Sequence, residues 1–502
     1  MNAISVKNYR SINESPTVEL KSITVLVGKN SAGKSSFIRL FPLLKQTLER
    51  KIAGSLLWYG DYVDFGDFSQ AVSKAAPNSP IVISFDIEVK RDFYYYQQSE
   101  GRETKTVSVE LTIEDKEISK YVLCFFDQCV EIVVKNGDAY ITINGDNTVY
   151  GDRRIIASRR DGNLLPTLFW ESRKGNEKFF SSQSSLDDIE EKLIKYLIGD
   201  EKKNNKYRGD FLFMHSFDVM VSKKQMLELF SSLNKEKFLP KTIGDKTVVK
   251  YNNLLLAFQM QEIISRINDS ISVDMQQTSY IKPIRAMVNR YYRLQGLRVD
   301  ELDADGSNLP MILKNMSTIE LRRFEVWSKE KFGVVFSVVS TEGHISMVIR
   351  NDVNDVCYTN VADTGYGYSQ MLPIVMLLWM IHNSNKKIRT SVAPRAKTVL
   401  IEQPELHLHP AFQAKLIDVF ANVIREAKSS GIDIKIIFET HSETMINRIG
   451  ALIENGQIKE SDVNVLVFDK QNDQTIITSK SFDSNGLLLG WPADFFAPEE
   501  WL

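Results

Sequence analysis

The sequence predicts an α/β fold in which a mixed sheet carries a glycine-containing loop. A short β-branched apolar run, residues 23–27, leads into the loop at 28–35, and helical sequence follows directly. Two later apolar runs, 398–401 and 434–438, are each followed by a charged group and are separated by helical sequence, which is typical of α/β sheets. From about residue 81 to 156 polar and apolar residues alternate, which predicts antiparallel strands.

The loop has the residues of a phosphate-binding P-loop. Gly28 and Gly33 allow the backbone to turn so that its N–H groups face phosphate oxygens, and the following helix start adds partial positive charge. Lys34 would reach the β- and γ-phosphates, and the Ser35 hydroxyl would ligate Mg²⁺. The alternative is a glycine turn that matches the pattern by chance. The strand before the loop and the helix after it favour a nucleoside triphosphate site.

The composition is that of a soluble globular protein with several domains. The chain has 502 residues, of which 43% are hydrophobic and 25% charged. The net charge of −2 indicates no global basic field for nucleic acid, although a local patch remains possible. Three cysteines without metal-type spacing suit a reducing cytosol. Because no signal peptide opens the chain and the longest apolar run, 371–381, is too short for a bilayer, we expect a cytoplasmic, non-membrane protein.

Residues after two of the predicted strands could complete the nucleotide site. Glu402 follows the run 398–401, and a carboxylate there could hold Mg²⁺ through water. His441 lies just past the run 434–438, where ligands bind in doubly wound sheets, and could contact the γ-phosphate or the attacking water. The alternatives are stray acids at a strand end for Glu402 and a structural histidine for His441.

A third segment, residues 363–370, opens a predicted helix with glycines and a hydroxyl. It lies far from the P-loop in sequence. One interpretation is that it completes the site of a second copy, so that each nucleotide is clamped between two subunits. The alternative is a glycine-rich turn that starts a buried helix.

In this order the motifs resemble the ABC-type, SMC-like ATPases of the OLD family. The resemblance is closest to the stand-alone, PtuA-like ATPases of Septu and retron-associated antiphage systems. It covers roughly the first 70 residues and everything after about residue 280. It is carried by residues 8–11, the P-loop, 280–285, 365–370, 402–410, 440–442 and the ending 490–496.

The resemblance implies a role for each matching position. Glu402 would be the Walker B acid and a metal ligand with Ser35, His441 the switch histidine, and Arg10 a residue near the base or ribose. ATP and Mg²⁺ would be held in a head-to-tail dimer. The Walker A positions would be Gly28, Asn30, Ser31, Ala32, Gly33, Lys34, Ser35 and Ser36, and the signature positions Gly367, Ser369 and Gln370; Gln70 and Gln46 are candidates for the Q-loop.

One position departs from the wider ABC pattern. The residue after the Walker B acid is usually a glutamate that polarises the attacking water, but here it is Gln403. Glutamine can orient water but cannot accept a proton. Either Glu405 takes over this role or hydrolysis is slow, which would suit a switch rather than a motor.

The expected organisation has four parts. Residues 1–78 and 279–450 form the two halves of an ATPase head, and 79–278 an α+β insertion of strands followed by helices from about residue 185. Residues 451–502 form a small C-terminal module. The insertion carries Lys-rich patches at 201–208 and 235–250, for which a solvated helix face is the commoner meaning.

The leading hypothesis is an ATPase that acts in antiphage defence as the sensor or regulatory subunit of a partner effector such as a nuclease. It would act as a homodimer or higher homo-oligomer. The sequence predicts no coiled-coil arms, membrane helices or terminal acidic cluster of a TOPRIM nuclease. One alternative is a DNA-clamping ATPase of repair or maintenance, motivated by the Lys-rich patches. Another is a nucleotide-locked scaffold with little turnover, motivated by Gln403.

Overall fold

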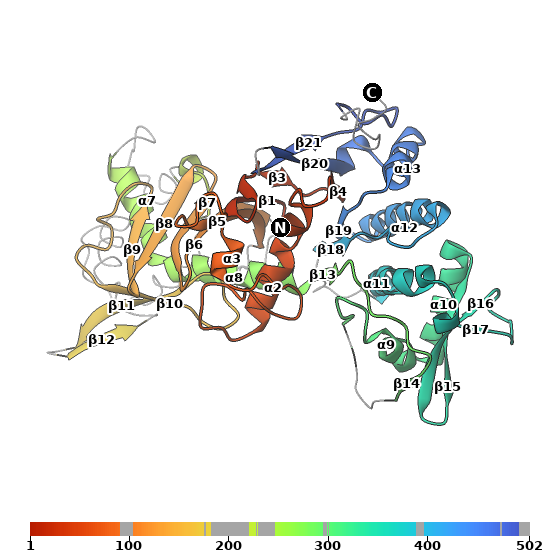
Figure 1. Ribbon diagram of the computed structural model, residues 1–502. Coiled ribbons are helices and arrows are strands. Elements are labelled where there is room, and N and C mark those ends of the chain that lie inside the picture. The colour runs from red at the N-terminus through yellow and green to blue at the C-terminus, as the bar shows by residue number, and fades with distance from the viewer. Residues whose placement is uncertain are drawn as a thin grey trace. The chain divides into compact units, whose positions relative to one another are not determined.

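The computed structural model describes residues 1–90, 104–174, 177–181, 220–226, 228, 246–294, 299, 301–387, 396–471 and 474–490. The described residues fall into two compact units (Figure 1). The antiparallel-sheet unit takes its residues from Met1–Tyr9, Gln46–Trp58 and Phe65–Met275. The parallel-sheet unit takes its residues from Arg10–Lys45, Tyr59–Asp64 and Gln276–Leu502.

A six-stranded sheet is the centre of the parallel-sheet unit. Neighbouring strands are parallel from β13 to β20, and β21 pairs antiparallel with β20. All residues of β4 are buried, which explains why its sequence is apolar except for Thr24. The carboxyl ends of the parallel strands therefore bring Gly28, Glu402 and Glu439 to one edge. The strand order is β13 (Thr278–Ile281), β18 (Ala396–Glu402), β19 (Asp433–Glu439), β4 (Ile23–Gly28), β20 (Val463–Gln471) and β21 (Gln474–Lys480).

Helices and a small second sheet complete this unit. Three of the helices start with side-chain caps: Ser317 caps α10, His409 caps α12, and Ser442 caps α13 by accepting a hydrogen bond from the Met445 N–H. Phe420 of α12 packs against Phe438 of β19 with ring centroids 5.6 Å apart. The main helices are α1 (Lys34–Ile38), α2 (Leu40–Glu49), α9 (Leu309–Asn315), α10 (Thr318–Phe332), α11 (Tyr366–Lys387), α12 (Pro410–Ser429) and α13 (Glu443–Glu454). The small sheet has β14 (Tyr292–Arg293), β15 (Val335–Thr341), β16 (His344–Arg350) and β17 (Thr359–Asn360); β2 (Ile12–Glu14), β3 (Val18–Glu19), η2 (Val361–Asp363) and η3 (Glu460–Asp462) are short.

In the antiparallel-sheet unit, the strands from β5 to β12 form a meander in which strands adjacent in sequence are paired, and β1 pairs with β5. The burial along β6 alternates, as expected for strands with one face on a core. In sheet order the strands are β12 (Glu177–Ser181), β11 (Thr167–Lys174), β10 (Ile155–Ser158), β9 (Asp138–Ile143), β8 (Gln128–Lys135), β7 (Ile118–Phe125), β6 (Thr104–Ile113), β5 (Ile81–Lys90) and β1 (Ala3–Tyr9). Its helices are α3 (Phe68–Ala71), α7 (Lys246–Phe258) and α8 (Met260–Gln276).

The α/β class and the antiparallel strands expected from about residue 81 are confirmed. The expected four-part division stays a prediction, and the two units do not follow it, because β1 at the start of the chain pairs antiparallel with β5. The helical pattern expected from about 185 is confirmed where it is described, in α7 and α8, whereas most of it before residue 246 lies outside the described ranges. Most of both Lys-rich patches and all but the first residue of the ending 490–496 also lie outside them.

Two further observations concern the cellular setting. Cys124 and Cys129, which lie opposite each other on β7 and β8, form a disulfide. The sparse cysteine count did not predict this pair, and because disulfides are uncommon in the cytosol the cytoplasmic location stays a prediction. Within the described part of the chain, no helix combines the length and apolar character needed to cross a bilayer.

Candidate nucleotide-binding site

The P-loop lies between β4 and α1, as its sequence predicts. Gly28 has φ +158°, and a Cβ there would stand 2.3 Å from the Phe468 carbonyl oxygen. Gly33 has φ +97°, and a Cβ there would stand 2.8 Å from the Thr475 hydroxyl oxygen. Glycine is thus required at both positions, because a side chain would collide with the neighbouring atoms of Phe468 and Thr475 and because these backbone conformations disfavour other residues.

Lys34 is buried beneath this loop. Its Nζ donates hydrogen bonds to the carbonyl oxygens of Gly28 and Lys29, each 2.9 Å away. The same nitrogen lies 3.9 Å from Oε1 of Glu439. Burial lowers the pKa of the ammonium group, and the nearby carboxylates of Glu439 and Glu405 oppose that shift. The ammonium group of Lys34 therefore lies near two carboxylates, those of Glu439 and Glu405.

Glu439, at the end of β19, contacts the P-loop serine directly. Its Oε2 accepts a 2.7 Å hydrogen bond from the Ser35 hydroxyl. The residue is only 2% exposed. Burial raises the pKa of this carboxyl, and the negative charge of Glu402 raises it further. Sequence reasoning missed Glu439, although it stands at the carboxyl end of a predicted strand, which is a signal that could have identified it.

Glu402, the expected Walker B acid, is bound by other residues of the chain. Arg39 donates to both carboxylate oxygens through Nε and Nη2, each at 2.7 Å. The Tyr280 hydroxyl donates to Oε1 at 2.6 Å. Glu402 is 1% exposed, so this is a buried, charge-matched carboxylate. Arg39 and Tyr280 were also missed, because nothing local in the sequence indicates contacts across such long separations.

Glu405 and His441 lie side by side. Oε1 of Glu405 accepts a 2.8 Å hydrogen bond from the backbone N–H of His441. Oε2 of Glu405 and Nε2 of His441 are sealed from solvent and meet no hydrogen-bond partner within 3.5 Å among the described residues, although the Thr440 side chain is close enough to Glu405 to lower its pKa. Burial raises the pKa of Glu405 and lowers that of His441, which Lys34 lowers further. Buried polar atoms without partners are costly, so they indicate a place where a ligand or water binds.

Gln403 joins the two strand ends. Its backbone adopts a left-handed conformation with φ +45°. Its N–H donates to the Glu439 carbonyl oxygen at 3.0 Å. Arg285 is almost fully buried and donates through Nη2 to the carbonyl oxygens of Glu402 and Gln403, at 2.9 and 3.2 Å. The turn that carries Gln403 is thus fixed from both sides.

The expected signature segment starts α11 and packs against the loop after β18. A Cβ on Gly367 would lie 3.0 Å from the His407 carbonyl oxygen. Ser369 and Gln370 are buried, and the Ser369 hydroxyl donates to the Tyr366 carbonyl oxygen at 2.8 Å. Tyr366 is 60% exposed. The accessible part of this segment is therefore its start, and its contact with a second copy stays a prediction.

The remaining expected positions differ in exposure. Arg10, with φ +52°, Asn30 and Ser31 are exposed. Ala32 is buried and Ser36 is half-buried. The Q-loop candidates Gln46 and Gln70 belong to the antiparallel-sheet unit, where buried Gln46 donates to the Leu57 carbonyl oxygen.

The residues at this site fit a nucleotide with Mg²⁺. The P-loop brings Lys34 and Ser35 to the strand ends, and four sealed polar atoms lack partners among the described residues: Oε2 of Glu405, Nε2 of His441, and Nε and Nη1 of Arg285. The described residues include no group of three or more His, Cys, Asp or Glu side chains suited to a metal. Magnesium in nucleotide sites commonly uses one or two protein ligands and completes its shell with phosphates and water, so Ser35 with one glutamate suffices.

Three solved structures of SMC head domains are similar to this chain at low identity. A head bound to the C-terminal winged-helix domain of ScpA has 9% identity, a TM-score of 0.34, and coverage of 96% of this chain and 98% of that chain. A head with an extended coiled coil bound to the C-terminal domain of ScpA, derived from Pyrococcus furiosus, has 10% identity, a TM-score of 0.35 and 96% coverage of both chains. The head domain from Thermotoga maritima has 12% identity, a TM-score of 0.32, and coverage of 95% of this chain and 98% of that chain. Similarity at this level does not assign a function.

One family model covers most of the chain. No curated protein matched the chain. The family model described as "AAA ATPase domain" matches residues 1–446, which include the P-loop, both strand-end glutamates and His441. The chain therefore belongs to the AAA ATPase domain family.

Proposed function

We propose that this ATPase binds ATP with Mg²⁺ and hydrolyses it slowly, as a switch. The observation that carries the proposal is the pair of sealed, unpartnered atoms on Glu405 and His441, next to the P-loop lysine. Glu405 counters the burial that lowers the pKa of Lys34, and Lys34 adds to the burial that lowers the pKa of His441, which supports a position of both groups near the phosphates. Gln403 after the first strand-end glutamate supports a low rate, because an amide cannot take a proton from water.

Each residue of the site has a proposed role. The P-loop N–H groups and Lys34 hold the phosphates, and Ser35 holds Mg²⁺. The Ser35–Glu439 hydrogen bond supports a role for Glu439, in addition to Glu402, as an acid that holds the metal. When bound, Mg²⁺ neutralises charge on the phosphate oxygens.

Water activation would be divided between two side chains. Gln403 orients the water, and Glu405 is the group that can accept its proton. Its raised pKa brings this carboxylate closer to neutral pH, where a general base is most effective. His441, kept neutral by burial and by Lys34, can donate or accept one hydrogen bond at Nε2.

The biological role in the proposal rests on the resemblance of the motifs to OLD-type, PtuA-like ATPases. The ATP-bound form would be a head-to-tail dimer that includes Gly367, Ser369 and Gln370 of each copy. That dimer would regulate a partner effector such as a nuclease in antiphage defence. The exposed start of α11 at Tyr366 is consistent with contact to a second copy.

The test combines ATP turnover and light scattering on purified protein, with Lys34→Ala as control. We expect slow turnover and an ATP-dependent dimer, both lost in the variant. Retained turnover in Lys34→Ala would contradict the assignment of the site. Turnover strongly stimulated by DNA would favour the DNA-clamping alternative. Co-purifying nucleotide with no measurable turnover would favour the locked scaffold.

A further inference from the structure

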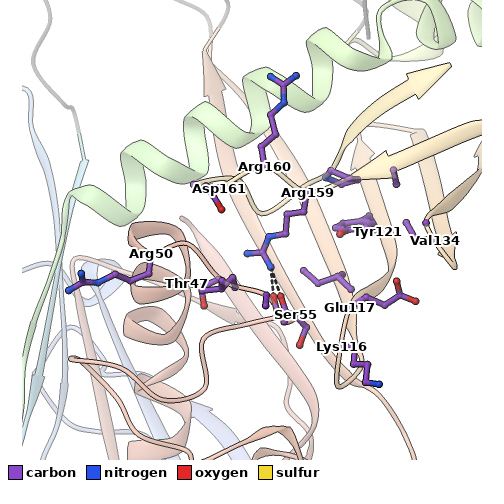
Figure 2. Close-up of a pocket in the computed structure, with 18 residues that line it drawn as sticks. Thr47, Arg50, Ser55, Lys116, Glu117, Tyr121, Val134, Arg159, Arg160 and Asp161 are labelled. Atoms are coloured by element: carbon purple, nitrogen blue, oxygen red, sulfur yellow. Dashed lines mark hydrogen bonds between the residues drawn. The ribbon is translucent and has the colours of Figure 1, made fainter. Parts of the chain in front are cut away.

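A polar cavity lies in the antiparallel-sheet unit, and no P-loop residue lines it. Its volume is about 270 Å³. It is formed by the segment 50–55 after α2, by the β6–β7 turn with the start of β7, and by the loop at 159–162 (Figure 2). This volume lies near the lower end of the range for small-molecule sites, so the cavity suits a compact ligand rather than a polymer.

Basic side chains outnumber acidic ones around this cavity. The basic residues are Arg50, Lys116 and Arg159, together with Arg160, whose side chain extends away from Arg159 (Figure 2), and the two acidic ones are Glu117 and Asp161. The Asp161 carboxylate lies 3.7 Å from Lys51 Nζ, so a neighbouring cation already balances part of its charge. The surroundings therefore favour an anion.

Arg159 places a guanidinium group inside the cavity, and no described carboxylate forms an ion pair with it, although Asp161 interacts with it electrostatically. Its Nε donates to the Asn163 carbonyl oxygen at 2.9 Å, and its Nη1 donates to the carbonyl oxygens of Gly54 and Ser55. The third nitrogen, Nη2, forms no hydrogen bond and no ion pair with any described residue, and it is not sealed from solvent. Figure 2 shows Arg159 directed toward Ser55, whereas Arg160 extends the opposite way.

Burial of this charge makes an anionic partner favourable. Desolvation lowers the pKa of Arg159, and Tyr121 and Asp161 offset that shift only in part, so the charged form is still disfavoured. A half-buried guanidinium is stabilised when an anion supplies matching charge and hydrogen-bond acceptors.

Tyr121 provides a second donor. The residue is 3% exposed and lines the same cavity. Its hydroxyl has no hydrogen-bond partner among the described residues and is not sealed from solvent. An electrostatic interaction links the hydroxyl to Arg159, so the two groups are near each other. Buried hydroxyls usually have a partner, and an acceptor bound in the cavity would supply one.

We propose that this cavity binds a small phosphate-bearing anion through Arg159 and Tyr121. A phosphate monoester carries close to two negative charges at neutral pH, so it supplies the opposite charge for the Arg159 guanidinium. The planar guanidinium suits the paired oxygens of a phosphoryl group, and the tyrosine hydroxyl donates to a third. The site is separate from the proposed ATP site and does not depend on it.

Calorimetric titration of the full chain in the Lys34→Ala background tests the proposal, because that variant removes the main phosphate contact of the P-loop. The probes are inorganic phosphate, pyrophosphate and AMP, with adenosine and malonate as uncharged and dicarboxylate controls. We expect one saturable event with at least one phosphate probe, and none with adenosine. No event with any phosphate probe, or malonate binding as tightly as phosphate, would overturn the proposal.

Three substitutions then locate the event. Arg159→Gln should abolish it, and Tyr121→Phe should weaken it about tenfold, since one hydrogen bond to a charged group is lost. Arg160→Gln is the matched control: it removes the same charge from the neighbouring residue and should change affinity less than threefold. Equal losses in Arg159→Gln and Arg160→Gln would overturn the site. Because Arg159 also holds two loops together, Tyr121→Phe keeps the test valid if Arg159→Gln does not fold.

Discussion

Two adjacent strands of one sheet each end in a buried glutamate, and the surroundings of these two side chains differ. Glu402, at the end of β18, accepts three hydrogen bonds from Arg39 and Tyr280, so its charge is matched within the chain. Glu439, at the end of β19, accepts one from the Ser35 hydroxyl and has Lys34 at 3.9 Å. Glu402 and Glu439 therefore lie opposite each other on neighbouring strands but differ in their surroundings: the charge of Glu402 is paired within the fold, whereas that of Glu439 lies beside the P-loop serine.

The largest expected effect is on stability. Glu402→Gln should lower the free energy of unfolding by about 3 kcal/mol, because Arg39 and Tyr280 lose a charged acceptor in a buried setting. The matched variant Glu439→Gln keeps a hydrogen-bond acceptor for Ser35 and should show no such loss. Denaturant unfolding of both variants measures the difference. Equal losses would show that the two carboxylates are equally important to the fold.

For ATP turnover we expect the larger loss in Glu439→Gln and the smaller loss in Glu402→Gln. Glu439→Gln should lower ATP turnover about 100-fold and raise the Mg²⁺ concentration needed for half-maximal rate, because the carboxylate that touches Ser35 has been made neutral. Magnesium titrations at saturating ATP give both values. If Glu402→Gln alone shifts the magnesium requirement while remaining folded, then Glu402 is the metal-holding acid and Glu439 is not.

The sequence predicted some of the residues at these two strand ends. Glu402 and His441 could be identified because each lies just past a mostly apolar run, and such runs are buried parallel strands. Glu439 directly follows the same run as His441, but its role depends on which strand neighbours β4, and that order cannot be read along the chain. Arg39 and Tyr280 lie 363 and 122 residues from Glu402, so no local pattern indicates their contacts with it.

The same limit applies to the division of the chain. Alternation along residues 81–156 was enough to predict antiparallel strands, because one face of each strand is buried. It did not indicate that β1, some seventy residues earlier, is the partner of β5. Pairing over such a separation depends on tertiary packing, which a single sequence does not contain.

Gln403 allows a sharper test, because its N–H joins its own strand end to Glu439. Gln403→Glu should raise turnover about tenfold, since a carboxylate at this position can accept a proton from water. Multiple-turnover kinetics at saturating Mg²⁺ measure the change. Glu405→Gln is the companion variant: if it abolishes turnover while Gln403→Glu has no effect, Glu405 alone accepts the proton.

The smallest expected effect is the pH dependence that Glu439 gives to stability. Burial raises the pKa of this carboxyl above its ordinary value of 4.5, so the folded chain holds the proton more tightly than the unfolded chain. Stability is therefore lost as pH rises from 4.5 through the raised pKa. Glu439→Gln removes that loss and should unfold with a free energy about 1 kcal/mol higher at pH 7. Below pH 4.5 the difference should vanish, because the carboxyl is then protonated in both states. Unfolding curves for both proteins across pH 4 to 8 measure it, and a constant offset over that range would mean that the Glu439 charge is already matched, as that of Glu402 is.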